Sequence, residues 1–230
     1  MRILYANGDL LAVVKPVGVP SQPDKTGDAD LLRLLAPEFG PLYPIHRLDR
    51  PVGGVMVLGR TEAGTGVELL HKEYIAVVCG SLPAAGELTH YLKKRERDNT
   101  SRVVSAHEKG AKLARLQYET LAERPGPPEN SGVDGKAWPG PLQLVKIRLQ
   151  TGRHHQIRVQ MAAAGAPLWG DRKYNPAFAR YRGKTPLALW AASLTLRDGC
   201  GQEHTFAADP AGAPFDWFAG RALGREEDGT

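Results

Sequence analysis

The chain has 230 residues, of which 42% are hydrophobic and 24% charged, and its formal net charge is +5. This composition is typical of a globular protein of one domain or two small ones. The chain has no apolar run near the ~20 residues that span a bilayer, no secretory signal, and too few cysteines, Cys79 and Cys200, for a disulfide framework. We therefore expect a cytoplasmic protein that does not bind membranes. The modest positive charge is compatible with a polyanionic partner without establishing one.

The N-terminal part of the chain predicts extended segments separated by loops. Asn7-Gly8 lies between two apolar runs and is a strong β-hairpin signal. Prolines and glycines further along interrupt regular structure. The elements expected here are strands at 3–5, 10–14 and 55–58, and a short helical turn at 31–35 that Pro37 and Gly40 close.

Two further helices are predicted, each with a threonine at its start as an N-cap. Their apolar residues recur at helical spacing. The first follows Thr61 and carries Ala63, Val67 and Leu70, and the second follows Thr151 and carries Ile157, Met161 and Ala164, with a stop at Gly165.

The remaining segments predict strands. These are 74–79, 145–149, 187–196, the surroundings of Thr205-Phe206, and several between 86 and 123. Alternation in the 145–149 strand gives it one cationic face, with Lys146 and Arg148. A second group of cations, Lys93-Lys94-Arg95 with Arg97, lies in a charged turn.

Many strands, few helices and no regular alternation of the two predict an α+β fold with a mixed, mainly antiparallel sheet. The stretch 124–141 is so rich in proline and glycine that we expect a long hairpin loop and no domain boundary. We expect a single domain over 1–220 and a flexible polar tail at 221–230.

The segment from His46 to Gly54 places one carboxylate, Asp49, between Arg47 and Arg50 and ahead of two glycines. Neighbouring cations favour the ionised carboxylate, which suits a nucleophile or a base. The glycines allow the backbone to approach a ligand closely. Taken alone, the same residues also fit a salt-bridged turn without chemistry.

A second polar group, Arg153, Gln156 and Arg158, crowds the start of the predicted C-terminal helix. Helix N-termini favour anions, and guanidinium forks bind phosphate or carboxylate groups. A solvated helix face fits these residues as well. The adjacent His154 and His155 lack the i, i+4 spacing by which a helix presents two zinc ligands on one side, so no metal site is expected.

Two other segments, 72–80 and 170–174, alone would be an ordinary strand and a turn. The chain has no nucleophile elbow, no Walker A segment and no Gly-rich dinucleotide-binding turn.

The order of these segments is more informative than any one of them. The chain reads His46-Arg47-Leu48-Asp49, then Lys72-x-Tyr74-x-Ala76-x-Val78-x-Gly80, then Gly152-Arg153-x-His155-Gln156-Ile157-Arg158-Val159, then Gly165-x-Pro167-x-x-Gly170-Asp171-x-x-Tyr174. This order closely resembles the RluA-type pseudouridine synthase family, whose start is also similar to the segment 10–18. The resemblance covers about residues 3 to 218.

The resemblance implies an α+β catalytic domain with a mixed, mainly antiparallel sheet. It implies that Asp49 is the essential aspartate, that Tyr74 stacks on the target base, and that Arg158 pairs with the aspartate. It also implies that Arg47 lies beside the flipped nucleotide. His46, Arg153, His155 and Gln156 are further expected substrate contacts. Many members carry an N-terminal RNA-binding domain, for which we expect no room before residue 3.

Several positions depart from the family pattern. Val52-Gly53-Gly54 stands in place of the usual Thr-Ser-Gly, and Trp190 in place of a frequent histidine. His154 occurs where Thr or Ser is common, and Gln160 where His is common. The first change removes two hydroxyls near the site and puts substrate choice, more than chemistry, in doubt. None of the changes affects Asp49, Tyr74 or Arg158.

The sequence therefore predicts an RNA pseudouridine synthase acting on uridine in structured ribosomal or transfer RNA. The reaction exchanges one bond for another, so we expect no cofactor and no metal, and we expect a monomer. A catalytically idle RNA-binding or chaperone protein with the same fold is the alternative. A glycoside hydrolase is more remote, because no second carboxylate accompanies Asp49 in any motif.

Overall fold

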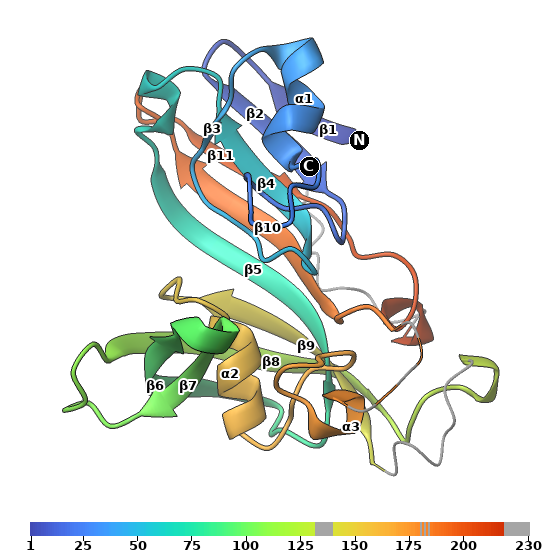
Figure 1. Cartoon of the computed structure of the whole chain (residues 1–230). Coiled ribbons are helices and arrows are strands. Elements are labelled where there is room, and N and C mark those ends of the chain that lie inside the picture. Colours follow the sequence, from blue (N-terminus) through green and yellow to red (C-terminus); the bar gives the residue numbers. More distant parts are fainter. Residues whose placement is uncertain (132–139, 180, 182, 184, 219–230) are drawn as a thin grey trace. The chain divides into compact units, whose positions relative to one another are not determined.

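The computed structural model describes residues 1–131, 140–179, 181, 183 and 185–218. The chain divides into two compact units, coloured along the sequence in Figure 1. The first unit comprises Met1–Tyr74 and Leu189–Pro210, and the second comprises Ile75–Ala188 and Ala211–Thr230. One strand, β5, belongs to both, because the division falls after Tyr74 within it.

The first unit is built on strands in the order β1-β2-β4-β10-β5. Two short strands lie off this path, because β3 pairs with β4 and β11 with β10. The strands are β1 (Arg2–Ala6), β2 (Leu10–Lys15), β3 (Tyr43–Pro44), β4 (Gly53–Gly59), β5 (Glu68–Cys79), β10 (Leu189–Arg197) and β11 (Glu203–Ala207). β4 and β10 run parallel, whereas β1 with β2, β2 with β4, β3 with β4 and β10 with β11 are antiparallel.

Local chemistry accounts for the first elements. Asn7 closes the β1–β2 hairpin because its side-chain oxygen accepts hydrogen bonds from the amides of Asp9 and Leu10. The helix α1 (Leu31–Phe39) begins at Asp30, whose buried carboxylate accepts from the amides of Leu32 and Arg33. This N-cap satisfies amides that have no partner within the helix.

The second unit carries strands in the order β5-β9-β8-β6-β7. These are β6 (Ala85–Arg95), β7 (Thr100–Val104), β8 (Lys112–Arg124) and β9 (Leu142–Leu149), and β6–β7, β6–β8 and β8–β9 are antiparallel. The helix α2 (Gln156–Ala163) lies against β6 and β7 in Figure 1, and a one-turn helix α3 (Pro176–Ala179) follows it. Val159 anchors α2 by packing on Leu92 and Ala114. The mixed, mainly antiparallel sheet with few helices confirms the predicted fold class.

Three helix predictions need correction. Thr61 accepts a hydrogen bond from Gly64, but only a 3-10 turn at Ala63–Thr65 follows, because Gly64 and Gly66 disfavour a helix and β5 begins at Glu68. The turn predicted at 31–35 is the longer helix α1, which continues through Pro37 to Phe39.

The third correction concerns α2, which begins later than predicted. Thr151 does not cap it, because Thr151 donates to the side chain of Gln156 at 2.8 Å and accepts from the amide of Arg115. The N-cap is His155, with a left-handed φ of 54°. The stop at Gly165 is confirmed, since Gly165 has a φ of 80° and donates to the carbonyl of Ala162.

Two predictions fall partly outside the described residues. Most of the Pro- and Gly-rich loop, 132–139, and the whole of the tail 221–230 lie there. Within the part of the chain that is described, no helix is long and apolar enough to cross a membrane.

Candidate active site

The Asp49 turn, residues 47–52, connects to the start of β4 in the first unit. Ser21 holds Leu48 from both sides, because its hydroxyl donates to the Leu48 carbonyl at 2.7 Å and accepts from the Leu48 amide at 3.1 Å. The Val52 amide closes the turn on the Asp49 carbonyl at 2.9 Å. Asp49 therefore stands on backbone that is fixed on both sides of it.

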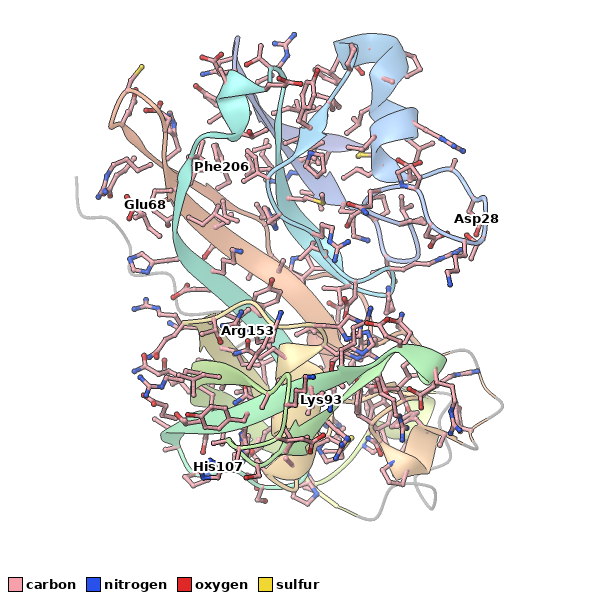
Figure 2. The ribbon with its side chains drawn as sticks, turned by 60° about the vertical axis from the view of Figure 1, so that its left-hand side comes forward. Asp28, Glu68, Lys93, His107, Arg153 and Phe206 are labelled. Carbon is pink, nitrogen blue, oxygen red and sulfur yellow. The ribbon has the colours of Figure 1, made fainter. Side chains whose placement is uncertain are left out.

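Arg50 fastens the same turn to the loop after β2. Its Nε donates to the Gly18 carbonyl, and Nη1 donates to Thr26 at 3.0 Å. Nη2 pairs with Asp28, which Figure 2 labels on that loop. The sequence predicted Arg50 as a cation for Asp49, but the structure shows its guanidinium engaged by this loop.

Lys15 supplies a charge beside Asp49 that sequence reasoning missed. It is fully buried at the end of β2, and its Nζ donates to the carbonyls of Pro16 (2.9 Å), Val19 (2.7 Å) and Arg50 (3.4 Å). Burial lowers the pKa of the Lys15 ammonium to about 8, while the negative charge of Asp49 acts to raise it. The one signal in the sequence that could have indicated this role is the position of Lys15 at the end of an otherwise apolar strand.

Tyr74 lies within electrostatic reach of Asp49. Burial and then the charge of Asp49 raise the pKa of the phenol above its usual range, so Tyr74 stays protonated at neutral pH. The structure thus brings together, in the first unit, the aspartate and the tyrosine that the sequence singled out.

His46 and Lys72 form a second pair of polar groups in the first unit. Nε2 of His46 accepts from the Val57 amide at 3.1 Å, so this imidazole is tied to β4. Burial, with the charge of Lys72 adding to it, lowers the His46 pKa to about 3, and the ring is neutral. Lys72 is half-buried two residues before Tyr74 on β5, on the same strand face, and burial lowers its pKa.

Arg158 is buried in the second unit in a two-pronged ion pair with Asp171. Its Nε and Nη2 each lie 2.8 Å from a carboxylate oxygen of Asp171, and both side chains are almost fully buried. The guanidinium also lies over the Tyr174 ring, 5.1 Å from its centroid. Pairing of Arg158 with Asp49 stays a prediction. Asp171 occurred in the fourth motif, but sequence reasoning gave it no role.

The residues before α2 are joined in one hydrogen-bonded network. The buried Gln156 side chain accepts from Thr151 and from the Arg153 amide at 2.9 Å, and it donates to the Arg115 carbonyl. Arg153, labelled in Figure 2, is an exposed residue, and its Nε donates to the Leu113 carbonyl. The Gln156 side chain therefore holds the backbone before α2 in place, in addition to any contact it makes with RNA.

The two adjacent histidines do face the same side, contrary to the geometric argument from sequence. Their rings stack with centroids 3.8 Å apart, because the left-handed His155 precedes the helix and does not follow helical directions. Nδ1 of His154 contacts the Ser101 hydroxyl and Nδ1 of His155 contacts the Tyr174 hydroxyl. Burial and then the charge of Arg158 lower the His155 pKa to about 2. The described residues contain no group of three metal-ligating side chains.

Comparison with known proteins identifies the class of enzyme. Residues 9–163 match the family described as RNA pseudouridylate synthase, and the chain belongs to this family. It is a pseudouridine synthase, an RNA-modifying isomerase.

Proteins similar to this chain in sequence or fold are also named as pseudouridine synthases. The chain is 30% identical to tRNA pseudouridine synthase C of Haemophilus influenzae, with 85% of this chain and 87% of the relative covered. It is 31% identical to ribosomal large subunit pseudouridine synthase D of Xanthomonas campestris, with 80% and 55% covered. Human RNA pseudouridylate synthase domain containing 1 has the same fold, with a TM-score of 0.72 at 21% identity over 91% of this chain and 83% of that one.

The Arg158–Asp171 pair predicts how an arginine variant will behave. Arg158→Met leaves the Asp171 carboxylate buried without a counter-charge, so we expect a loss of about 3–5 kcal/mol in the free energy of unfolding. Adding Asp171→Asn removes that charge and keeps the oxygen that accepts from the amides of Lys173 and Tyr174. The double variant should regain stability in chemical denaturation but not pseudouridine formation. Activity that returns together with stability would show that Arg158 is purely structural.

Lys15 predicts a pH dependence of stability. The folded protein releases the Lys15 proton near pH 8 and the unfolded chain near pH 10.5, so the unfolded chain binds more protons between these values. Wild-type stability should therefore gain about 2 kcal/mol from this group between pH 8 and 10. Denaturation curves of Lys15→Met should lack this gain, whereas the exposed-lysine control Lys25→Met should keep it. Equal pH slopes for wild type and Lys15→Met would contradict the assignment.

Proposed function

We propose that this enzyme isomerises uridine in transfer or ribosomal RNA, with Asp49 as its nucleophile or base. The relatives named above act, by their names, on transfer RNA and on the large ribosomal subunit. The observation that carries the proposal is the Asp49 turn, in which one carboxylate is held on fixed backbone beside a buried ammonium and a buried tyrosine.

The chemistry suits these groups. The target base must leave the helical stack before its glycosidic bond can be reached, at a cost of a few kcal/mol. Asp49 then starts cleavage of the N1–C1′ bond, by attacking the ribose or by abstracting a ribose proton. The uracil turns and rejoins carbon 1′ of the ribose through its carbon 5, which releases Asp49 if it had attacked the ribose and returns the ribose proton if Asp49 had abstracted it. Carbon 5 then loses its proton, and N1, freed from the ribose, takes up one. Tyr74 offers a flat, protonated ring on which the detached base can stack.

The other residues predicted for the site have supporting roles in the proposed reaction. Arg158 supports the charge of Asp49, and Arg47, Arg153 and His155 contact the RNA. His46 and Gln156 act mainly as positioning residues, because their polar atoms hold β4 and the segment before α2. Both units serve one catalytic domain over 1–220, which is consistent with a family match that extends from residue 9 to residue 163.

Asp49→Asn removes the nucleophile or base, so we expect pseudouridine formation to fall below a few per cent of wild type in a protein that still folds. Its midpoint of unfolding should fall somewhat, because the variant loses the negative charge that favours the buried Lys15 ammonium. Asp9→Asn, at the exposed β1–β2 hairpin, is the matched control and should retain activity. The assay follows pseudouridine in unmodified transfer RNA and ribosomal RNA incubated with each protein. Substantial activity of the Asp49→Asn variant would rule out the assigned role, and mapping pseudouridines lost from cells without the gene would name the target.

The cationic cluster around β6 and β7 is less positive than its sequence indicates. Lys93, labelled in Figure 2, pairs with Glu108 at 3.0 Å, and Lys94 pairs with Glu96 at 2.7 Å. Arg95 pairs with Asp98. Exposed pairs of this kind are worth about 0–1 kcal/mol, so an RNA phosphate can replace the carboxylate at small cost.

Two opposite variants test whether this surface binds RNA. Replacing Lys93, Lys94 and Arg95 by alanine should weaken RNA binding and flatten its salt dependence, since each lost phosphate contact removes about 0.7 from the log–log slope on single strands. Replacing their acidic partners by Glu108→Gln, Glu96→Gln and Asp98→Asn should tighten binding and steepen the slope. Salt titrations in which neither variant differs from wild type would show that the cluster is only a solvated surface.

A further inference from the structure

Trp190 and Gly53 face each other on the parallel strands β10 and β4. They are direct partners in the strand register, as are Ala191 and Gly54. A Cβ atom placed on Gly53 would lie 2.5 Å from Cζ3 and 2.9 Å from Cε3 of the Trp190 ring, closer than such atoms approach. The indole thus occupies the room that any side chain at position 53 needs.

The indole cannot easily move aside. Its Nε1 donates to the Ala208 carbonyl at 2.7 Å, which fixes the ring at its polar edge. Its backbone is held in register, and Gly54 adapts to the same approach with a φ of 119° that a larger residue rarely adopts. A half-buried aromatic ring is therefore presented in one orientation.

This ring lies beside the Asp49 turn. Val17 also borders Gly53, with its Cγ2 atom 3.0 Å from the same Cβ position, and Val17 is 46% exposed. The Gly18 amide donates to the Arg50 carbonyl at 2.9 Å, which ties the Val17 segment to the turn. Val17 and Trp190, which pack over the buried Gly53, form what we call the indole patch, two uncharged side chains next to the turn that carries the proposed catalytic aspartate.

We propose that the indole patch is a stacking surface for an unpaired nucleobase next to the target uridine, and that Gly53 is glycine because the ring needs its space. The proposal rests on the proposed function and adds a specificity-determining residue to it. A fixed, flat and uncharged aromatic surface binds the face of a base and is tolerant of which base it is. Tyr74 remains the partner of the target base itself.

Single substitutions give the first test. Trp190→Ala should raise KM for unmodified transfer RNA by about 5- to 160-fold, the usual effect of one lost stacking contact. The rate at saturating RNA should change less than about threefold, because uniform binding is lost without touching the reacting groups. Trp190→Phe should keep most of the affinity. An unchanged KM in a folded Trp190→Ala protein overturns the proposal.

A double-mutant cycle distinguishes stacking from a packing role. Gly53→Ala places a methyl group where the indole lies, so it should force the ring out of its present orientation at a cost in stability and raise KM like Trp190→Ala. It should have little further effect on KM once Trp190 is alanine. Additive effects of the two changes would mean that Gly53 acts independently of the ring. Thermal unfolding of each variant shows whether a loss of affinity is a loss of fold.

Fluorescence tests the contact without turnover. Added transfer RNA should quench wild-type emission, and Trp190→Phe should remove most of that quench although three of the four tryptophans remain. A quench that persists in Trp190→Phe, or a concentration-dependent dimer that Trp190→Ala dissociates without changing RNA affinity, overturns the proposal. Wild type that forms no pseudouridine in any RNA tested contradicts the proposed function instead, and quenching would still report on the patch.

Discussion

The buried ammonium of Lys15 links the sheet of the first unit to its proposed chemistry. A lysine that is fully removed from water must have its hydrogen bonds met, and three backbone carbonyls meet them here. One of these carbonyls belongs to Arg50, so the end of β2 determines where the Asp49 turn lies. The negative charge of Asp49 offsets part of the cost of burying this ammonium. A strand end, a loop and a carboxylate are thereby positioned by one side chain.

The second unit uses its buried charges in a similar way. Asp171 binds Arg158 through two nitrogens and also accepts from two backbone amides, so the arginine is held in one orientation before any RNA arrives. Such a pair contributes little net stability compared with an apolar pair of the same size, but it is costly to break. The main effect of the pair is therefore to fix the orientation of the Arg158 guanidinium, and its net contribution to stability is small.

The sequence was most informative where a local rule is strong. Asn7-Gly8, the alternation on β9 and the glycine after α2 each have one dominant structural outcome, and all three occur. Helix starts were predicted poorly for two different reasons. Thr151 bonds to the Gln156 side chain instead of capping a helix, whereas Thr61 does accept from the Gly64 amide but is followed by glycines that limit the segment to a 3-10 turn. The order of the motifs identified the family, although no single motif did.

The partners of the charged residues could not be predicted from the sequence. Arg50 is adjacent to Asp49 in the chain, but its guanidinium pairs with Asp28. Lys15 is far from Asp49 in the chain, but the charge of Asp49 acts on the pKa of its ammonium. Sequence adjacency says little about such pairs, because a turn sends consecutive side chains in different directions. His154 and His155 show the same limitation. The sequence predicted that adjacent side chains would point in different directions, but the left-handed backbone of His155 brings the two rings into a stack.

The geometry of β5 restricts how this enzyme can change during evolution. Lys72 and Tyr74 share one face of the strand because side chains alternate, so a single inserted or deleted residue between them would turn one of the two away. Strands β1 and β8 tolerate an extra residue, since each has a register irregularity, between Ile3 and Tyr5 and between Thr120 and Ala122. Drift in this lineage should therefore proceed by substitution along β5, while changes in length accumulate at the hairpins and at the sheet edges.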